Sequence, residues 1–360
     1  MTTTVERAEF IANHCIKMNS NTFLGNFSAK HLINWIQREL GDTNILDNYV
    51  QYGDSTRYTK AAPHGLILHI LSGNTEHAGH QSLLRGLRIG AKNIIKLPSS
   101  GLPELERWIQ NLPPELKNLV AIIENLNDEI FQSADIVIAI GSDNTMQEIQ
   151  KRITPQQRFI PHGHKLSIGL IESTTTETAK LAVKDACAFN QQGCLSLHSI
   201  YVKGNEQVAK SFLPLLANAM AEYEIINPRG DISISESGAI SNLREAVKYE
   251  AANDSANVAI LHSKGNTTWT AIYRNSPTLS PSVLNRVITV QPWPDNIEKL
   301  GPEHNYLSTL AVEKALLTSD IDFKAPRICP LGSSQEPSLD WHHDGFLPLG
   351  SLVKWHDLEL

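Results

Sequence analysis

The sequence predicts an α/β protein with a Rossmann-type parallel sheet domain, followed by a second α/β domain that carries the catalytic residue. From Gly65 onward, short apolar segments alternate with segments whose apolar residues recur at helical spacing. Such alternation is typical of a parallel sheet with helices on both faces. After Cys194 the alternation is looser but still mixes strand-like and helix-like segments. A chain of 360 residues is long enough for two or three domains.

The first predicted domain is preceded by a polar, helical segment at residues 1–60. In it, Leu32, Ile33, Ile36 and Leu40 recur at the spacing of a helix, and we expect the segment to pack on the nucleotide-binding domain. The strands predicted for residues 61–188, the nucleotide-binding domain, are the apolar runs at 65–71, 92–97, 119–123, 135–140 and 165–171. The helices predicted between them cover 75–90, 102–112, 127–134 and 145–153.

The second predicted domain, at residues 189–325, carries Cys194. Its strand candidates cover 196–202, 257–262, 269–273 and 286–291, and its predicted helices cover 206–220 and 306–317. Apolar helix residues at 211–220 suit either an acyl-chain tunnel or an ordinary core, and the core interpretation is favoured. Residues 326–360 are expected to return to the domain junction or to an oligomer interface.

Composition and charge argue against several functional classes for this protein. Apolar residues make up 41% and charged residues 19%, as in soluble globular proteins. A net charge of −7 argues against a general nucleic-acid binder. No apolar run approaches the roughly 20 residues of a membrane span, and the N-terminal residues lack the order of a signal peptide. The four cysteines, Cys15, Cys187, Cys194 and Cys329, are scattered without a CxxC pair, so we expect a cytoplasmic protein without a thiolate zinc site.

Cys194 follows a polar, glycine-bearing bend, "NQQG", and precedes an apolar, β-prone run. The thiol is therefore expected in a loop at the edge of a sheet, near the domain junction, where pockets are common. Nucleophile, metal ligand and packing residue are the three interpretations of its role. Backbone N–H groups of such a turn can stabilise a thiolate, and a thiolate can attack a carbonyl carbon. The amide of Asn74 and the backbone N–H of Cys194 are suitable donors to the resulting oxyanion.

The loops that follow the predicted strands are candidates for cofactor binding, because ligands bind such sheets at the carboxyl ends of the strands. Lys96 closes the second strand, and Gly141 and Ser142 close the fourth. Plain turn chemistry is the alternative for Gly141, and a solvated surface lysine is the alternative for Lys96. The stretch "KLPSSGLP" has a cation and two serines but no acid before Glu104. This composition suits a 2′-phosphate, so we predict NADP(H) over NAD(H).

Four motifs, in this order, resemble the aldehyde dehydrogenase superfamily. "SGN" at 72–74 resembles its motif that ends in an oxyanion-binding Asn, and "KLPSS" at 96–100 its segment at the adenosine ribose. "IGSDN" at 140–144 is similar to its loop at the cofactor phosphates, and "FNQQGC" at 189–194 to its nucleophile loop. The resemblance covers roughly residues 61–202 and implies an aldehyde dehydrogenase-like fold.

A branch of that superfamily resembles the chain more closely: the fatty acyl-CoA reductases related to the reductase subunit of bacterial bioluminescence. Residues 190–202 and 327–355 carry this likeness. The resemblance implies that Cys194 is the acyl-accepting nucleophile and Asn74 the oxyanion donor. It also implies a homo-oligomer. The cofactor contacts that it implies are Lys96, Ser99, Gly141 and Ser142.

The chain departs from the oxidising aldehyde dehydrogenases at "PHGHK", residues 161–165, where Pro161 takes the place of the Glu that activates the hydrolytic water. Hydrolysis of an acyl-enzyme is therefore not expected, and reduction is. His162 and His164 are both candidate proton donors. The "HGH" and "WHHD" histidines could also converge on a metal, but neither pair has helical i, i+4 spacing, so no metal site is predicted. Asp344–Gly345 is predicted to form a turn.

The predicted function is NADPH-dependent reduction of a fatty acyl thioester to the aldehyde through an acyl group on Cys194. The thioester donor is acyl-CoA or an acylated protein. One alternative is a cysteine acyltransferase or thioesterase that uses no nicotinamide, and another is a non-catalytic structural subunit with the same fold. Covalent acylation of Cys194 and NADPH oxidation distinguish the three.

Overall fold

The computed structural model describes residues 2–20, 28–53, 56–73, 76–294, 296–317 and 325–360. The chain divides into two compact units, each with its own hydrophobic core. Unit 1 comprises Met1–His164 together with Glu336–Leu360, and unit 2 comprises Lys165–Gln335. The boundary predicted between residues 188 and 189 falls inside unit 2, and the C-terminal segment from Glu336 onward is part of unit 1.

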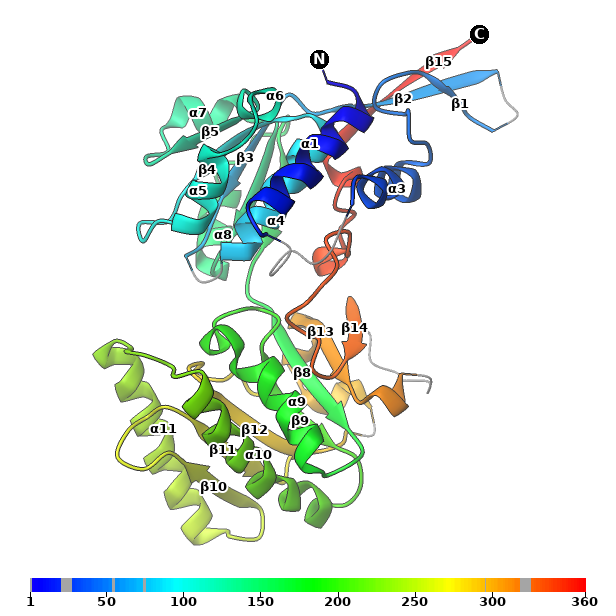
Figure 1. Ribbon diagram of the computed structural model, residues 1–360. Coiled ribbons are helices and arrows are strands. Elements are labelled where there is room, and N and C mark those ends of the chain that lie inside the picture. Colours follow the sequence, from blue (N-terminus) through cyan, green and yellow to red (C-terminus); the bar gives the residue numbers. More distant parts are fainter. Residues whose placement is uncertain (1, 21–27, 54–55, 74–75, 295, 318–324) are drawn as a thin grey trace. The chain divides into compact units, whose positions relative to one another are not determined.

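A parallel sheet lies at the centre of unit 1 (Figure 1). Its strand order within the described residues is β5 (Val120–Ile123), β4 (Lys92–Lys96), β3 (Leu66–Ile70), β6 (Ile136–Ile140) and β7 (Arg158–His162). Neighbouring residues of one strand face opposite cores, as Ile67 and Leu68 do, so both faces are buried. The parallel sheet predicted from the alternation is confirmed.

Helices cover both faces of this sheet. The core that contains Ile67 is shared with α1 (Thr4–Lys17), α3 (Ala29–Leu40), α4 (Glu76–Ile89) and α5 (Pro103–Gln110). The core that contains Leu68 is shared with α7 (Asp128–Ser133) and α8 (Asp143–Gln150), and the short helix α6 (Pro114–Lys117) precedes β5. Local signals set the helix ends: Thr3 and Glu6 form a capping box at α1, and Gly41, at φ +93°, ends α3.

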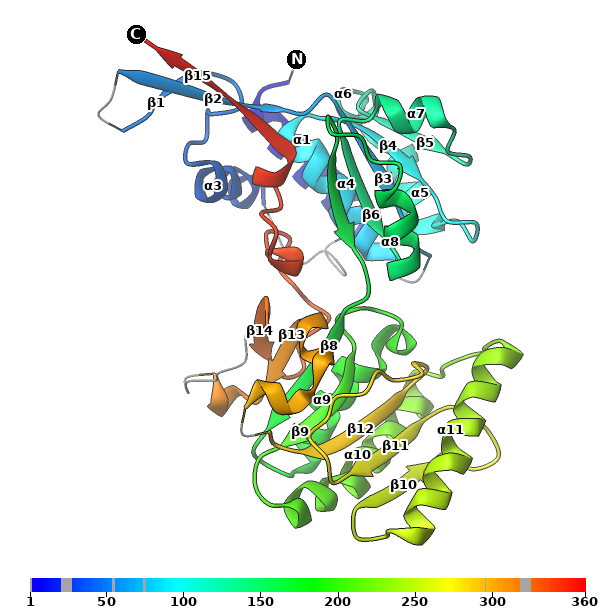
Figure 2. The same ribbon diagram turned by 180° about the vertical axis from the view of Figure 1, so that it is seen from behind.

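The C-terminal segment completes a second, antiparallel sheet of unit 1. This sheet has the order β1 (Val50–Gln51), β2 (Arg57–Pro63) and β15 (Val353–Glu359). β15 pairs with β2 along its whole length, from Val353 opposite Pro63 to Glu359 opposite Arg57. Figure 2 shows these two strands side by side, away from the parallel sheet of the unit. Strand β15 therefore pairs with a strand, β2, that lies far from it in the sequence.

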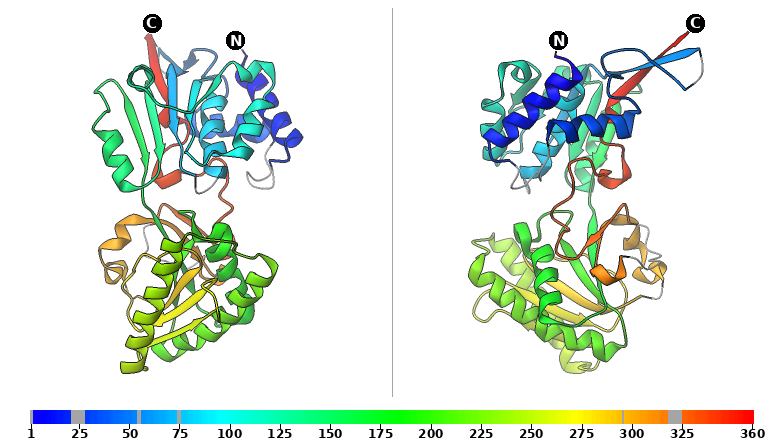
Figure 3. Two further views of the ribbon diagram at one scale, coloured as in Figure 1. Left: turned by 90° about the vertical axis from the view of Figure 1, so that its left-hand side faces the viewer. Right: turned by 45° about the vertical axis from the view of Figure 1, so that its right-hand side comes forward.

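A mixed sheet lies at the centre of unit 2 (Figure 3). Its order is β10 (Val258–His262), β11 (Thr270–Arg274), β12 (Val287–Pro292), β9 (Leu197–Val202), β8 (Leu166–Ile171), β13 (Leu307–Val312) and β14 (Arg327–Pro330). The β10–β11 pair is antiparallel and the other described pairs are parallel. One face packs on α9 (Thr176–Cys187) and α10 (Glu206–Ile226), and α11 (Ile234–Asn253) packs on Ile272 and Val287 of the other.

Two sequence predictions are wrong. The run at 165–171, expected as the fifth strand of the first sheet, is β8 of unit 2, and β7 takes the expected place. The helix expected at 306–317 is instead strand β13 followed by a short 3₁₀ turn at Lys314–Leu316. A short apolar run fits a helix or a fully buried strand equally well, and pairing with β8 and β14 decides for the strand. Among the described helices, none combines the length and apolarity that crossing a bilayer requires.

A buried histidine in β3 makes the stability of unit 1 sensitive to acid. His69 is fully buried, with Nδ1 2.7 Å from Ser82 Oγ and Nε2 3.0 Å from Asn93 Oδ1. Burial lowers the pKa of His69 from 6.5 to about 4. Between these values the unfolded chain binds a proton that the folded chain does not, so stability is full above pH 6.5 and falls toward pH 4.

We expect this histidine to lower the free energy of unfolding by about 2 kcal/mol between pH 7 and pH 5, at about 1.4 kcal/mol per pH unit below 6.5. Denaturant titrations at the two pH values measure the loss. His69→Gln should make the loss smaller, because it removes the titrating group, and His164→Gln, at an exposed position, should leave it unchanged. An equal loss in wild type and His69→Gln would assign the acid sensitivity to other groups.

Candidate active site

Cys194 lies in unit 2, in the short segment that joins α9 to β9. It is partly exposed, whereas the other three cysteines are buried. Burial raises the pKa of Cys15 and Cys187 to about 12 and that of Cys329 to about 11, so these thiols stay protonated at neutral pH. All four cysteines are among the described residues, and Cys194 is the one whose exposure suits a nucleophile.

The segment before Cys194 has an unusual backbone, which a buried glutamine stabilises. Phe189, Asn190 and Gln191 have φ values of +51°, +55° and +64°, in the left-handed region that residues other than glycine rarely adopt. The side chain of Gln191 is fully buried. Its Nε2 donates to the carbonyl oxygens of Leu197 and Val287, both at 2.9 Å, and its Oε1 accepts from Val287 N at 2.9 Å. These bonds tie the loop to β9 and β12, which fixes its conformation.

A second left-handed turn, at 284–286, is hydrogen-bonded to the loop that precedes Cys194. Its three residues have φ values of +64°, +55° and +67°. Arg286 Nη2 donates to Asn190 Oδ1 at 2.8 Å, and its Nη1 bonds to Glu224 Oε2 at 2.5 Å. Gln192 Nε2 donates to Asn285 Oδ1 at 3.2 Å. Sequence analysis missed this turn, because no glycine marks it and it lies about 90 residues beyond the cysteine.

Backbone and side-chain bonds also fix Cys194 and its flanks. Ser167 Oγ, on β8, donates to the carbonyl oxygen of Cys194 at 2.7 Å. Gln335 Nε2 donates to Ser196 Oγ at 3.1 Å and to the carbonyl oxygen of Asp185 at 2.9 Å. The Asp185 carboxylate accepts the N–H groups of the 332–334 loop, and burial nevertheless raises the pKa of Asp185 to about 6. The thiol thus projects from a segment that is braced on several sides, as pre-organised nucleophiles require.

The predicted cofactor residues lie at the carboxyl edge of the parallel sheet in unit 1. Lys96 ends β4, and Gly141 and Ser142 follow β6, so the two loops flank the end of β3. Ser99 is exposed in the loop after β4. Ser142 is the N-cap of α8, and its Oγ accepts from Thr145 N at 3.3 Å. Asn74, the predicted oxyanion donor, lies outside the described residues.

Glycine at 141 is not required by the fold itself. Its φ is not in the left-handed region, and a Cβ there would meet Met146 and Thr145 only at ordinary contact distances of 3.6 Å. Its N–H donates to the carbonyl oxygen of His162 at 3.1 Å, which fixes the loop against β7. The missing side chain therefore leaves space beside the backbone at a strand end, where a phosphate could approach closely.

The two candidate proton donors differ sharply. His162, at the end of β7, is buried, and its Nδ1 lies 2.7 Å from Asp344 Oδ2. His164 is exposed, and its backbone N–H donates to Asp143 Oδ1 at 2.7 Å. A carboxylate on Nδ1 orients an imidazole, so the buried His162 has the geometry of an acid–base group, whereas His164 lies exposed. The predicted Asp344–Gly345 turn is confirmed, with φ values of +53° and +83°.

The "HGH" and "WHHD" motifs do converge. Ligand atoms of His162, His343 and Asp344 lie within 4.8 Å of one another. The two imidazoles are stacked, however, with centroids 4.0 Å apart and an interplanar angle of 13°. Nitrogen lone pairs lie in the ring planes, so two nearly parallel planes at this separation cannot both direct a lone pair at one ion 2.0–2.1 Å away. The arrangement suits a hydrogen-bonded cluster better than a metal site.

Residues 4–355 match the model of the family described as acyl-CoA reductase (LuxC). The chain belongs to this family. The resemblance to fatty acyl-CoA reductases that the sequence motifs carry is therefore confirmed for this LuxC-family chain.

Relatives of this LuxC-family chain are named long-chain acyl-protein thioester reductases. The protein from Aliivibrio fischeri is 28% identical over 228 residues, which are 59% of this chain and 47% of that protein. The protein from Photorhabdus laumondii subsp. laumondii is 26% identical over 341 residues, 89% of this chain and 68% of that protein. The chain thus spans about half to two thirds of the length of these relatives.

Solved structures show that the LuxC-family chain has an aldehyde dehydrogenase fold. The NAD-dependent benzaldehyde dehydrogenase from Corynebacterium glutamicum has a TM-score of 0.66 and 12% identity, over 100% of this chain and 86% of that chain. The gamma-glutamyl-gamma-aminobutyraldehyde dehydrogenase from Burkholderia cenocepacia J2315 has a TM-score of 0.72 and 10% identity, over 99% and 84% of the two chains. The predicted fold class is confirmed.

Proposed function

We propose that this LuxC-family chain reduces fatty acyl thioesters to aldehydes with NADPH, through an acyl group carried on Cys194. The position of Cys194 carries the proposal: it is the partly exposed cysteine of the chain and follows a braced left-handed loop. Residues 189–325 would then supply the nucleophile, and residues 61–188 the cofactor site, although β8 and α9 belong structurally with the nucleophile.

The proposed reduction consumes no water at any step. The Cys194 thiolate attacks the carbonyl carbon of the thioester, the bond to the donor sulfur breaks, and the donor leaves as a thiol. A bound NADPH would supply the hydride for the acyl carbon and leave as NADP+, and with a proton on the oxygen the adduct on Cys194 would be a thiohemiacetal. Its collapse releases the aldehyde and restores Cys194. Donors such as the Asn74 amide would stabilise the oxyanion at both stages.

The sheet edge of unit 1 supports NADPH as the reductant. Lys96, Ser99, Gly141 and Ser142 would contact it, with the 2′-phosphate near the loop after β4. The first acid beyond that loop, Glu104, lies on α5 and pairs with Arg107 at 2.9 Å. It therefore belongs to the surface of the helix, and no carboxylate of this loop is left to bind ribose hydroxyls or to repel a phosphate.

The acyl donor is proposed to be acyl-CoA or an acylated protein. The names of the relatives favour an acylated protein, and the family description favours acyl-CoA. We further propose that the chain works as a homo-oligomer in the cytoplasm, where the thiol of Cys194 stays reduced.

An NADPH oxidation assay against acyl-CoA esters of increasing chain length tests the proposal. We expect a fall in NADPH absorbance that depends on acyl-CoA, the appearance of aldehyde, and a lower rate with NADH. Release of free fatty acid without NADPH oxidation would instead indicate a thioesterase, and no reaction with either acyl-CoA or an acylated protein would leave only a structural role. Faster turnover with NADH would refute the choice of cofactor.

A further inference from the structure

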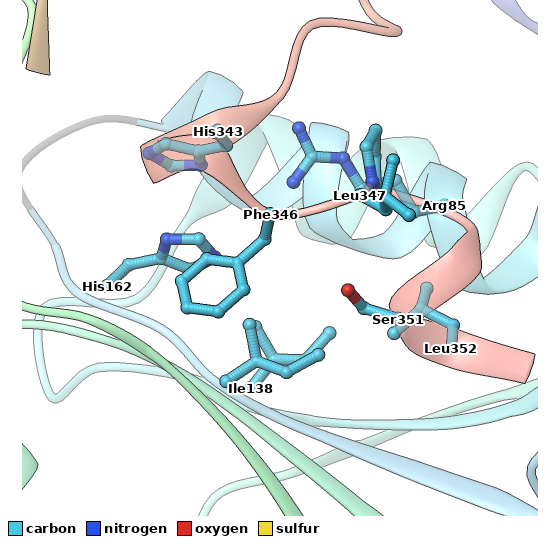
Figure 4. A pocket seen from close by; sticks show the side chains of 10 residues that line it. Arg85, Ile138, His162, His343, Phe346, Leu347, Ser351 and Leu352 are labelled. Carbon is cyan, nitrogen blue, oxygen red and sulfur yellow. The ribbon is translucent and has the colours of Figure 1, made fainter. Parts of the chain in front are cut away.

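A cavity in unit 1 lies beside His162, the candidate acid–base group. It holds about 290 Å³ of empty space, part of which opens to solvent. Figure 4 shows its walls: Ile138 from β6, His162 from β7, Arg85 from α4, and Phe346 and Ser351 from the C-terminal segment. The cavity thus lies where the C-terminal segment covers one face of the parallel sheet.

The guanidinium of Arg85 is buried without the hydrogen bonds that such a group needs. The residue is 6% exposed, and its Nε and Nη2 atoms are buried with no hydrogen-bond partner among the described residues. Burial lowers the pKa of Arg85 to about 10, so the side chain is still charged at neutral pH. A buried cation that lacks partners is strongly destabilising, and native structures supply a partner in the form of protein, water or ion.

Neighbouring carboxylates do not fill this role. Glu39 and Asp344 both act electrostatically to raise the pKa of Arg85, but neither accepts a hydrogen bond from Nε or Nη2. Glu39 Oε2 instead accepts the N–H groups of Leu349 and Gly350, at 2.5 and 3.0 Å. Asp344 Oδ2 is bonded to His162. One oxygen of each acid is thus engaged with another group, and no oxygen of either acid accepts from Nε or Nη2 of Arg85.

The two unpaired N–H groups of Arg85 have a defined geometry. Nε–H and Nη2–H lie on the same edge of the planar guanidinium and point in parallel, which matches the two oxygens of a carboxylate. The other walls include the apolar side chains of Ile138, Ile160, Leu347 and Leu352, and the Ser351 hydroxyl. A carboxylate head with a short hydrocarbon tail fits both features, whereas a fully hydrated or multiply charged anion would lose hydration against the apolar walls.

We propose that this cavity binds a small aliphatic monocarboxylate, such as formate, acetate or propionate, with its two oxygens on Arg85 Nε and Nη2. The bound anion lies between α4 and the C-terminal segment, so binding stabilises the packing of residues 343–352 on the rest of unit 1. The inference does not rest on the proposed reductase activity, because the anion contacts Arg85 and neither Cys194 nor the cofactor loops, although His162 lines the same cavity.

Calorimetric titration of the full chain with acetate, in a sulfonate buffer at constant ionic strength, tests the site. We expect one acetate per chain, and a thermal unfolding midpoint that rises with the logarithm of the acetate concentration, by roughly 3–6 °C at a hundredfold excess over Kd. Chloride at the same ionic strength should not raise it. Equal effects of acetate and chloride would mean that the cavity holds only water, and would overturn the proposal.

Two variants locate the binding. Arg85→Met removes the donors, and Arg85→Lys keeps a charge but loses the parallel pair of N–H groups, so both should weaken acetate binding at least about tenfold. If Arg85→Met does not fold, Arg85→Lys alone decides. Arg107→Met is the control, because Arg107 is an exposed arginine of the same unit, and it should retain the acetate response. Retention of wild-type acetate binding in Arg85→Lys would place the anion elsewhere and refute the assignment.

Discussion

Replacement of Cys194 by alanine is expected to abolish both covalent acylation and NADPH oxidation. The variant lacks the sulfur that attacks the thioester, and the other three cysteines are buried, with pKa values raised to about 11 or 12. Intact mass measurement after incubation with acyl-CoA should show one acyl group on the wild-type chain and none on Cys194→Ala. The thermal midpoint should stay close to that of wild type, because the side chain is partly exposed.

Cys329→Ala is the matched control for this experiment. It removes a thiol from unit 2 that is buried in β14, so acylation of Cys194 should continue at the wild-type extent. If the acyl group were found on another residue in the wild type, or if Cys194→Ala still oxidised NADPH in the presence of acyl-CoA, the assignment of the nucleophile would be wrong.

Replacement of Gln191 by leucine is expected to be the most damaging change in the loop apart from loss of the cysteine itself. The substitution leaves the buried N–H of Val287 and the carbonyl of Leu197 without their side-chain partner, whereas the Val287 carbonyl keeps a bond from Ser282 Oγ. We expect a loss of about 2–4 kcal/mol in the free energy of unfolding, measured by denaturant titration. The rate of Cys194 acylation should fall by about tenfold or more, because the left-handed segment is no longer fixed.

Gln192→Leu is the comparison for this variant. Gln192 is the next residue along the chain, but its side chain donates only to Asn285 Oδ1 among the described residues, at 3.2 Å, and it is partly exposed. Its loss should therefore change stability by less than about 1 kcal/mol. The rates of Cys194 acylation in the two variants are measured at a temperature where each variant is fully folded. If Gln191→Leu acylated as fast as Gln192→Leu under these conditions, Gln191 would support the fold without positioning the nucleophile.

Local patterns in the sequence predicted most of the parallel sheet of unit 1. The apolar runs at 65–71, 92–97, 119–123 and 135–140 correspond to β3, β4, β5 and β6, because strands buried on both faces must be apolar throughout. β7 was missed because it carries Arg158, Pro161 and His162 and reads as a loop. The 306–317 run was misassigned because partners distant in sequence, and not local spacing, make β13 a strand.

The candidate site likewise contains residues that local sequence patterns predict and residues that they do not. Cys194, Gly141 and Ser142 could be found from sequence because turns before or after strands have local signals. The groups that support them could not, because each contact joins distant segments: Arg286 reaches Asn190 across 96 residues, and Asp344 reaches His162 across 182. No local rule links such pairs. The burial of Arg85 could not be predicted either, since an arginine in a helix normally extends into solvent.

The pairing of β15 with β2 has a consequence for synthesis on the ribosome. Unit 2 is one continuous stretch, so its residues have all been translated once Gln335 is added. The antiparallel sheet of unit 1 forms later, because its closing strand, Val353–Glu359, is translated long after its partner, Arg57–Pro63. During translation β2 therefore presents an unpaired edge while about 290 further residues are added, a period in which a chaperone or a neighbouring nascent chain could occupy it.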